Sequence, residues 1–528
     1  MTGKVYLIGA GPSDVGLLTI KGKEILQKAQ VVVYDRLVGA GILALIPEEA
    51  EAIDVGKRAG NHTMPQEEIN QLLLAKAKEG KKVVRLKGGD PFLFGRGGEE
   101  LELLSEHDIP FEIIPGVTSA ISVPAYNGIP VTHRDFTSSL HIITGHKRQG
   151  EKLNLDFEAL VRLKGTLVFL MGISALSDIC QGLLHAGMEP DMPAAVLQQG
   201  TTAGQKKIIA TVSTLPEETE QQGIQTPAII VVGKVCDLGN RFEWYEKKPL
   251  FGKRILVTRP KERSGTLSGK LREAGAEVIE MPAIKTLPIP ENEKLEKELS
   301  HLAEYQYLVF TSPAGVNIFL DTLKQQKKDI RSIGTARIAA IGAGTKRELE
   351  QRGLFCDLVP EIYDGEHLGI LLGETAKKGE KILIPRAKEG NQQLLLEIAK
   401  RTEAEVTDLP IYETVYEPAR FLPEHIDMAV FTSASTVRGF AQAVSQQSPQ
   451  NAQTVHAEMQ QPPQEAQTAT AEMQEGNFLN IRKIQAICIG KQTEAAAKEL
   501  GMNTITAKEA TIDSLVECCI AYTSQSQQ

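Results

Sequence analysis

Short apolar runs rich in β-branched residues alternate along the chain with segments in which apolar residues recur at helical spacing. The short runs are typical of buried strands, and the longer periodic segments favour amphipathic helices. In the first half, examples of the strands expected from this pattern are residues 5–8, 31–34, 83–86, 140–144, 167–171 and 229–232. Alternation of strands with helices along the whole chain predicts an α/β protein.

The pattern is interrupted between residues 240 and 252 by a charged stretch that contains the chain's single tryptophan, Trp244. A new strand is expected directly afterwards, at 254–258. A chain of 528 residues is too long for one ordinary core, so several domains are expected. We predict one region from 1 to 240, a linker from 241 to 252 and a second region from 253 to 522.

The second region contains an internal repeat. Three short motifs, each placed at the end of an expected strand, occur twice in the same kind of context and predict two similar α/β halves. The matching pairs are 309–312 with 430–433, 341–342 followed by Thr345 with 489–490 followed by Thr493, and 255–257 followed by Arg259 with 382–384 followed by Arg386.

The second half of the repeat is longer than the first, and the excess falls in a glutamine-rich stretch at 444–476. Within it, residues 452–460 recur almost unchanged as 466–474. Such low-complexity sequence lacks the apolar surface that would offset the entropy of ordering it. It is predicted to be a disordered surface insertion without a catalytic role; a segment that binds a partner is the alternative.

Composition and charge exclude several classes of function. The formal net charge of −9 argues against a large basic surface for nucleic acid. The six cysteines show neither a CxxC motif nor metal-ligand spacing, so we expect no metal site and no disulfide framework, as in a reducing cytoplasm. The first apolar run is too short for a signal segment or a membrane span. We therefore expect a cytoplasmic protein without nucleic-acid or membrane partners.

Glycine-rich and charged turns follow four of the first expected strands. The turn 9–14 departs from the dinucleotide fingerprint because Pro12 intervenes and the third glycine is missing. Asp35 follows the second strand and Lys57 the third, and the glycine-rich run 85–100 continues from the fourth. Small residues flanked by charges at the carboxyl edge of a parallel sheet indicate loops shaped around a ligand. Ordinary strand-to-helix turns with solvated charges are the alternative.

Together with the segments 115–120, 128–134 and 226–233, these motifs make residues 3–240 resemble uroporphyrinogen-III C-methyltransferase. The run 85–100 is the most discriminating part. The resemblance implies a two-domain tetrapyrrole methylase fold, a homodimer formed through this half, and S-adenosylmethionine bound between the two domains. Ser13 departs from the family, which usually has glycine there; we expect this change to leave binding intact.

The resemblance also implies roles for individual residues. It assigns the base to Asp35 and the proton donor to Lys57, and it places Arg96 near the site of methyl transfer. The residues that match the family's cofactor contacts are Pro12, Gly88, Gly89, Asp90, Leu93, Thr118, Ser119, Met171 and Gly200. A tetrapyrrole substrate carries many carboxylates, so basic side chains near the cleft are candidates to bind it: Arg36, Arg58, Arg85 and Arg134.

Beyond residue 253 we find no phosphate loop and no nucleophile with an evident base. The expected strand ends are instead rich in small hydroxyl residues, which can donate hydrogen bonds to carboxylates or cap the helices that follow. With the repeat and the segments 383–386 and 409–416, residues 253–522 resemble uroporphyrinogen-III synthase. The family fold implies two α/β domains joined by a pair of strands, here 253–283 with 417–522, and 284–416.

The synthase family closes linear hydroxymethylbilane while it inverts the last pyrrole ring, and it requires no cofactor. Tyr412 matches the family's tyrosine and is a candidate proton donor, although it could simply pack between strands. The hydroxyl residues expected to hold substrate carboxylates are Thr311, Ser312, Thr345, Ser433 and Thr493.

The two resemblances together predict a bifunctional enzyme that converts hydroxymethylbilane through uroporphyrinogen III to precorrin-2, on the branch toward sirohaem and cobalamin. Two alternatives stay open. The first half could methylate RNA, which the acidic balance and the run 85–100 disfavour. The second half could be a non-catalytic module that binds tetrapyrrole.

Overall fold

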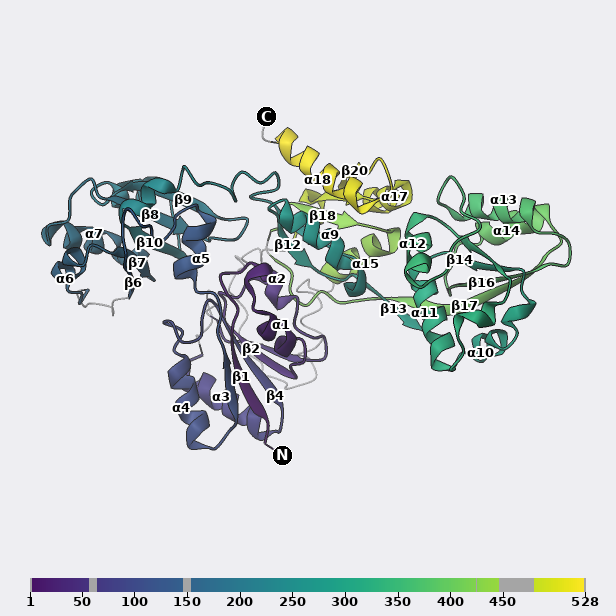
Figure 1. Ribbon diagram of the computed structural model, residues 1–528, viewed down its shortest axis with the longest axis horizontal. Helices are drawn as coiled ribbons and strands as arrows, with labels where there is room; N and C mark the ends of the chain where they lie inside the picture. Colours follow the sequence, from purple (N-terminus) through teal and green to yellow (C-terminus); the bar gives the residue numbers. More distant parts are fainter. Residues whose placement is uncertain (1, 57–63, 146–152, 424, 446–478, 527–528) are drawn as a thin grey trace, which may run out of the picture. The chain divides into compact units, whose positions relative to one another are not determined.

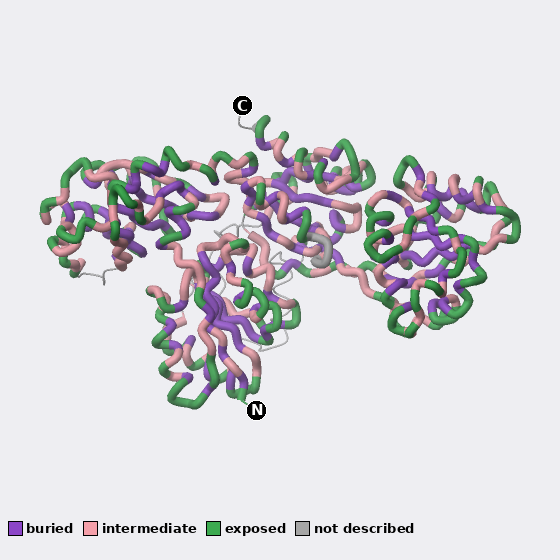
Figure 2. Tube along the Cα trace, in the orientation of Figure 1, coloured by how far each residue is buried: buried purple, intermediate pink, exposed green. Residues whose placement is uncertain are grey.

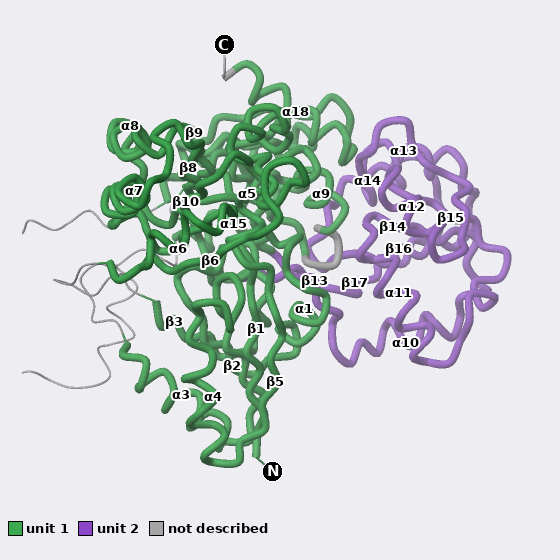
Figure 3. The backbone as a smooth tube through the Cα atoms, turned by 60° about the vertical axis from the view of Figure 1, so that its left-hand side comes forward, with its two compact units in different colours: residues 1–283, 418–528 green, residues 284–417 purple. Residues whose placement is uncertain are grey.

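The computed structural model describes residues 2–56, 64–145, 153–423, 425–445 and 479–526. These form two compact units. The first comprises 1–283 with 418–528 and the second spans Ile284–Glu417 (Figure 3). In the ribbon of Figure 1, strands alternate with helices along most of the chain, so the predicted α/β class is confirmed.

The first sheet has the order β3-β2-β4-β1-β5, and all its strands are parallel. Its strands are β1 (Lys4–Gly9), β2 (Val31–Tyr34), β3 (Glu51–Asp54), β4 (Lys82–Lys87) and β5 (Phe111–Ile114), and its helices are α1 (Ile20–Leu26), α2 (Ala40–Leu43), α3 (Gln66–Lys78) and α4 (Gly97–Glu106). Successive strand residues enter opposite cores: Val31 and Val33 pack with α3, whereas Val32 and Tyr34 pack with α1 and α2. Helices cover both faces, as a parallel sheet requires.

The second sheet has the order β6-β7-β10-β8-β9, in which β6 and β7 are parallel and the other neighbours antiparallel. Its strands are β6 (Leu140–Thr144), β7 (Thr166–Leu170), β8 (Pro193–Gln198), β9 (Lys206–Thr211) and β10 (Ala228–Val232), with α5 (Ser119–Tyr126), α6 (Phe157–Arg162), α7 (Leu176–His185) and α8 (Leu215–Gln221). Helix α5 covers one face through Ala120 and Val123, and α7 covers the other. The two sheets are therefore the cores of two domains.

The third sheet is parallel, with the order β12-β11-β18-β19-β20. Its strands are β11 (Arg254–Val257), β12 (Glu277–Glu280), β18 (Met428–Phe431), β19 (Gln485–Cys488) and β20 (Asn503–Thr506), with α9 (Lys261–Glu273), α15 (Ala434–Ser445), α17 (Lys491–Glu499) and α18 (Ile512–Ser526). Val444 and Ser445, the first two residues of the predicted glutamine-rich insertion, end α15; residues 446–476 lie outside the described part of the chain.

The second unit holds the fourth sheet, with the order β13-β17-β16-β14-β15. Its strands are β13 (Ile284–Pro288), β14 (Tyr307–Phe310), β15 (Arg337–Ala340), β16 (Lys381–Ala387) and β17 (Glu405–Tyr416), with α10 (Glu293–Leu299), α11 (Pro313–Gln325), α12 (Ala343–Gln351), α13 (Gly365–Thr375) and α14 (Gln393–Arg401). Strand β13 runs antiparallel to β17 and the other neighbours are parallel.

The third and fourth sheets contain the repeat that the sequence predicts. Strands β11, β18 and β19 are neighbours in the same order as β16, β14 and β15. The packing repeats as well, because Phe310 lies edge-on to Phe319 of α11 with ring centroids 5.5 Å apart, and Phe431 contacts Phe440 of α15 at 5.6 Å. Buried residues follow the strands of each sheet (Figure 2).

Within the first unit, the segment that enters β18 also contacts the first sheet's domain. The Arg420 guanidinium donates to the carbonyls of Pro47, Glu48 and Ala50, and the Phe421 ring lies edge-on to Tyr34. Tyr34 directly precedes Asp35, so this contact reaches the end of β2. None of the helices in the described residues combines the length and apolar character that a membrane crossing requires.

Candidate active sites

Three turns at the carboxyl ends of β1, β4 and β5 pack backbone against backbone. Gly11 and Gly89 exchange hydrogen bonds of 2.8 and 3.1 Å between their amide and carbonyl groups. A Cβ atom on Gly116 would lie 2.2 Å from the Gly89 carbonyl oxygen, and one on Gly9 2.5 Å from the Gly116 Cα. Only glycine fits such an approach. Gly89 itself has φ +68°, and a Cβ there would meet nothing within 4 Å. The described chain leaves that side of the turn open.

The Asp90 carboxylate organises this turn. One oxygen accepts hydrogen bonds from the amides of Phe92 and Leu93 at 2.8 and 3.1 Å, and the other accepts from the Gly116 amide at 3.0 Å. The acid therefore joins the loop after β4 to the loop after β5.

Several non-glycine residues with positive φ follow strands of the two methylase domains. They are Ser13 after β1 (φ +103°), Met171 after β7 (+56°), and Gln199 and Thr201 after β8 (+45° and +72°). Such conformations cost on the order of 1–3 kcal/mol each and are concentrated at functional sites. The value at Ser13 also explains why glycine suits that position.

A buried ion network lies beneath the end of β2. The Arg85 guanidinium donates to Asp35 Oδ1 at 2.6 Å and, through Nε, to Glu100 Oε1 at 3.0 Å. Lys87 Nζ donates to the same Glu100 oxygen at 2.6 Å. Arg85 and Glu100 are 2% and 0% exposed, whereas Asp35 is 30% exposed. The network therefore presents one carboxylate, that of Asp35, at the sheet edge.

The charges of this network shift the pKa values of its cations. Burial lowers the pKa of Lys87, and the neighbouring Arg85 charge adds to that effect. For Arg85, burial acts in the same direction, but the carboxylates of Glu100 and Asp35 outweigh it and raise the pKa. Arg85 consequently stays charged beneath Asp35.

In the second unit, a serine and a tyrosine meet at the end of β14. Ser312 caps α11 by accepting the Gly315 amide at 3.0 Å, and its hydroxyl lies 2.7 Å from the Tyr412 hydroxyl. Tyr412 is 5% exposed, in β17. Close by, Arg386 of β16 is buried and forms a bidentate ion pair with Asp408, at 2.5 and 2.6 Å.

The first unit contains the corresponding strand end. Ser433 and Thr436 bond reciprocally at the start of α15, each side chain accepting the other's amide at 3.3 Å. The Ser433 hydroxyl also lies 2.8 Å from that of Ser435. Both serines of the repeat are thus helix caps, the alternative that the sequence left open.

Comparison with known proteins gives two matches along the chain. The family model of tetrapyrrole (corrin/porphyrin) methylases matches residues 4–216, and that of uroporphyrinogen-III synthase HemD matches residues 265–460. The porphyrin biosynthesis protein HemD of Ruminiclostridium josui is 47% identical over 522 residues, which cover 98% of this chain and 97% of that protein. The chain belongs to this family of fused proteins. It is a bifunctional enzyme of tetrapyrrole biosynthesis, with a methylase half and a uroporphyrinogen-III synthase half.

Two further relatives match the methylase half. The S-adenosyl-L-methionine-dependent uroporphyrinogen III methyltransferase of Methanosarcina barkeri is 52% identical over 45% of this chain and 93% of its own length. The crystal structure of uroporphyrin-III C-methyl transferase from Thermus thermophilus, complexed with S-adenyl homocysteine, is 39% identical. It covers 44% of this chain and 99% of its own, with a TM-score of 0.39.

The methylase half brings most of its predicted cofactor residues to strand ends. Pro12, Gly88, Gly89, Asp90 and Leu93 lie on the turns after β1 and β4. Thr118 caps α5, Ser119 begins it, and Met171 is 50% exposed at the end of β7. Gly200 is buried against Val123, where a Cβ would lie 2.4 Å from the valine Cγ1.

The predicted basic residues differ from one another in exposure and in ion pairing. Arg36 and Arg134 are exposed, and Arg96, with φ +57°, is 57% exposed and paired with Glu99 at 2.6 Å. Lys57 and Arg58 lie outside the described residues. Arg85 requires a correction, because its guanidinium is buried and already paired with two carboxylates. Its position supports a role in holding Asp35 rather than a contact with substrate.

Two synthase residues also require correction. Thr345 and Thr493 are the third residues of α12 and α17, and they are 2% and 3% exposed. Their side chains pack inside the two domains, so the predicted contact with substrate carboxylates is not supported. Thr311 is half-buried at its strand end, as are both serines.

A single sequence gave little signal for several residues that shape the methylase half. Glu100 shares the inward face of α4 with Gly97 and Leu104, and this helical spacing could have revealed its burial. The sequence around Tyr126 and Thr201 shows no such spacing, yet both side chains form hydrogen bonds with the loop after β1.

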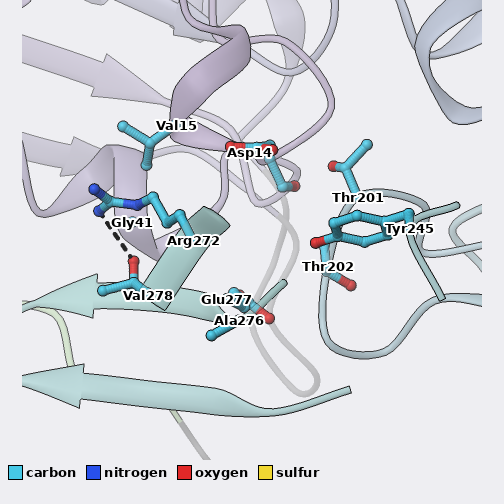
Figure 4. Close-up of a pocket in the computed structure, with 11 residues that line it drawn as sticks. Asp14, Val15, Gly41, Thr201, Thr202, Tyr245, Arg272, Ala276, Glu277 and Val278 are labelled. Carbon is cyan, nitrogen blue, oxygen red and sulfur yellow. Dashed lines mark hydrogen bonds between the residues drawn. The ribbon is translucent and has the colours of Figure 1, made fainter. Parts of the chain in front are cut away.

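A shallow pocket within the first unit is lined on one side by residues 13–15 of that loop (Figure 4). In the close-up, Asp14 lies opposite Thr201, Thr202 and Tyr245, and Val15 lies above Arg272. Its floor comes from residues 272 and 276–278 next to β12, where Arg272 bonds the Val278 carbonyl. None of the predicted cofactor residues lines this pocket, but Ser13 and Thr201 of its lining directly adjoin two of them, Pro12 and Gly200.

Proposed function

We propose that this enzyme converts hydroxymethylbilane to precorrin-2 in two stages. The synthase half closes the bilane to uroporphyrinogen III with inversion of ring D, and the methylase half then transfers two methyl groups from S-adenosylmethionine. The observation that carries the proposal is the buried network that presents Asp35 beside the three glycine turns.

The turns fit a bulky donor on the evidence of their own geometry. Gly89 leaves open the space that a side chain would fill, and the strained residues Ser13, Met171 and Thr201 follow strands β1, β7 and β8. We propose that the donor is held there by Pro12, Gly88, Gly89, Asp90, Leu93, Thr118, Ser119, Met171 and Gly200. S-adenosylmethionine supplies an already activated methyl group, so alignment is the protein's main task.

Asp35 is the proposed base. Its carboxylate accepts a hydrogen bond from buried Arg85, which fixes one oxygen and leaves the side chain partly exposed toward the sheet edge. A group held in this way can take a proton from the methylated macrocycle without first reorganising. We assign the proton donor to Lys57 and the binding of substrate carboxylates to Arg36, Arg58, Arg96 and Arg134.

In the synthase half, Tyr412 is the proposed proton donor for the departing hydroxyl group of the bilane. The Ser312 hydroxyl, 2.7 Å away, keeps the phenol in a defined orientation. Thr311, Ser312 and Ser433 lie at half-buried strand ends and are the proposed contacts for substrate carboxylates. After its hydroxyl group departs, the bilane is a cation-like intermediate. The protein then mainly has to hold the bilane in the folded shape that closes correctly, and it need not form a bond to it, so no cofactor is invoked.

We further propose a homodimer formed through the methylase half and a cytoplasmic enzyme.

The test is to incubate the purified chain with hydroxymethylbilane, with and without S-adenosylmethionine, and to identify products by chromatography and mass. We expect uroporphyrinogen III without the donor, and with it a product that is heavier by two methyl groups. Uroporphyrinogen I alone would contradict the synthase assignment. Consumption of the donor with RNA but not with tetrapyrrole would contradict the methylase assignment.

Matched variants sharpen this test. Asp35→Asn should lower methylation by about 100-fold or more, since general-base groups contribute on that order, and should leave cyclisation unchanged. Asp108→Asn, an exposed acid of the same domain at φ +53°, is the control and should behave as the wild type.

A further inference from the structure

The loop after β1 is tied to the second methylase domain at two points. The Tyr126 hydroxyl, at the end of α5, donates to Asp14 Oδ2 at 2.7 Å, and the Thr201 hydroxyl donates to the Pro12 carbonyl at 2.7 Å. Helix α5 packs on β7 and β10, and Thr201 follows β8. Both bonds therefore cross from one domain to the other and end on either side of Ser13.

These hydrogen bonds restrain the backbone on both sides of Ser13. Its φ of +103° is one that residues with side chains rarely adopt, and such a conformation persists only where the surroundings impose it. The loop supplies restraints of its own, from the Gly16 amide to Asp14 Oδ1 at 2.7 Å and from the Leu17 amide to the Asp14 carbonyl at 3.0 Å. Two further restraints come from Tyr126 and Thr201.

Tyr126 is in turn held by the segment that connects the two enzymes. Its ring contacts those of Trp244 and Tyr245, with centroids 5.2 and 4.7 Å away, and Trp244 Nε1 donates to the Ala125 carbonyl at 2.9 Å. In Figure 4, Tyr245 and Thr201 lie together on one side of Asp14. Residues 243–246 thus pack on the methylase half, whereas Lys248 and Leu250, further along the segment, pack against α9 and the third sheet.

Ion pairs attach this segment to the second sheet. Lys207 of β9 donates to Glu243 and Glu246 at 3.0 and 2.5 Å, and Gln205 donates to the Tyr126 carbonyl and to Glu246. Burial, together with the Asp14 charge, raises the pKa of Tyr126. The phenol therefore stays protonated and donates to the carboxylate.

We infer that Tyr126 and Thr201 are positioning residues for the methyl donor, and that the connecting segment 241–252 supports Tyr126 in this role. They hold the turn of Pro12 and Ser13 in its strained conformation, so that the donor meets a preformed surface. The inference rests on the proposed function, because it takes this turn to be a donor contact. A preformed turn raises affinity by removing the cost of ordering it.

The experiment uses the full chain and compares Tyr126→Phe, Thr201→Val and Thr201→Ser with the wild type. Each variant is titrated with S-adenosylhomocysteine by calorimetry, and KM is measured for both substrates of the methylase half. Tyr245→Phe is the matched control, since it alters a ring of the same cluster without removing the bond to Asp14. Valine keeps the β-branched shape of Thr201, so backbone strain is unchanged.

We expect Tyr126→Phe and Thr201→Val each to weaken S-adenosylhomocysteine binding and to raise KM for the methyl donor about tenfold, the scale of one hydrogen bond to a charged or buried group. Thr201→Ser and Tyr245→Phe should stay within twofold, as should KM for uroporphyrinogen III in every variant. Donor affinity within twofold of wild type in both Tyr126→Phe and Thr201→Val would overturn the inference, as would an equal loss for both substrates. A wild-type chain that does not bind S-adenosylhomocysteine would overturn the proposed function itself.

Discussion

The hydroxyl groups of Ser312 and Tyr412 lie 2.7 Å apart, although 100 residues separate them in the sequence. Ser312 follows β14 and caps α11, so its position is set by the helix that it begins. Tyr412 lies in the long strand β17, which pairs with both β13 and β16. The tyrosine is therefore held by two strand neighbours and one side chain, as expected of a group kept in a single orientation.

Tyr412→Phe should slow formation of uroporphyrinogen III by more than about tenfold, because a positioned proton donor contributes at least that much. Bilane that is not captured closes spontaneously, so the type I isomer should increase in parallel. Isomer analysis of the products measures both effects. Tyr416→Phe, at an exposed position of the same strand, is the control. An unchanged rate in Tyr412→Phe would assign the residue to packing.

Glu100→Gln should destabilise the methylase half by about 3 to 5 kcal/mol, since removing one member of a buried ionic group leaves the others uncompensated. Glu100 Oε1 is the common acceptor for Arg85, Lys87 and Gln66, and an amide cannot neutralise the two cations. Urea denaturation measures the loss. Glu106→Gln, exposed on the same helix, should stay within about 0.5 kcal/mol. Equal stability of the two variants would contradict the network.

Sequence reasoning reached the fold because apolar periodicity and the repeat are properties of neighbouring residues. Each strand predicted in the first half overlaps an observed one, and the repeated motifs end corresponding strands of the third and fourth sheets. The resemblance of each half to a known enzyme family predicted the two families, and a family model matches each half.

The same reasoning missed partnerships between strands. Asp35 and Arg85 were predicted as a base and a separate substrate contact, and their ion pair follows from the adjacency of β2 and β4. Apolar periodicity does not reveal the order of strands in a sheet, so the sequence could not predict this ion pair. It could not predict the hydrogen bond between Tyr126 and Asp14 either, because 112 positions separate the two residues. Burial of Thr345 and Thr493 depends likewise on which elements cover each helix.

Glu112→Gln should destabilise the protein at neutral pH, and the difference should shrink in acid. Hydrogen bonds from Lys21 and Lys4 lower the pKa of Glu112 from 4.5 to about 2. A carboxylate with a depressed folded pKa stabilises the fold above its unfolded pKa, and the contribution is lost as the pH falls from about 4.5 toward 2. Melting temperatures of both proteins at pH 7 and pH 3, in low salt, test this. A constant difference would contradict the assignment.

The cysteines should divide into two classes of reactivity toward a thiol reagent at pH 8. Burial raises the pKa of Cys180, Cys488 and Cys519 to about 12. Burial also raises the pKa of Cys236, so all four thiols hold almost no thiolate, which is the reactive form.

Cys356, with its pKa raised to about 11, and Cys518 are half-buried and within reach of the reagent. Labelling of the folded enzyme followed by mass mapping should therefore find modification at these two, at a slow rate, and at all six after unfolding in denaturant. Fast labelling of Cys236 in the folded enzyme would show that the second methylase domain opens, because that thiol is fully buried and bonded to the Val231 carbonyl. A disulfide-linked pair under non-reducing conditions would contradict the six free thiols.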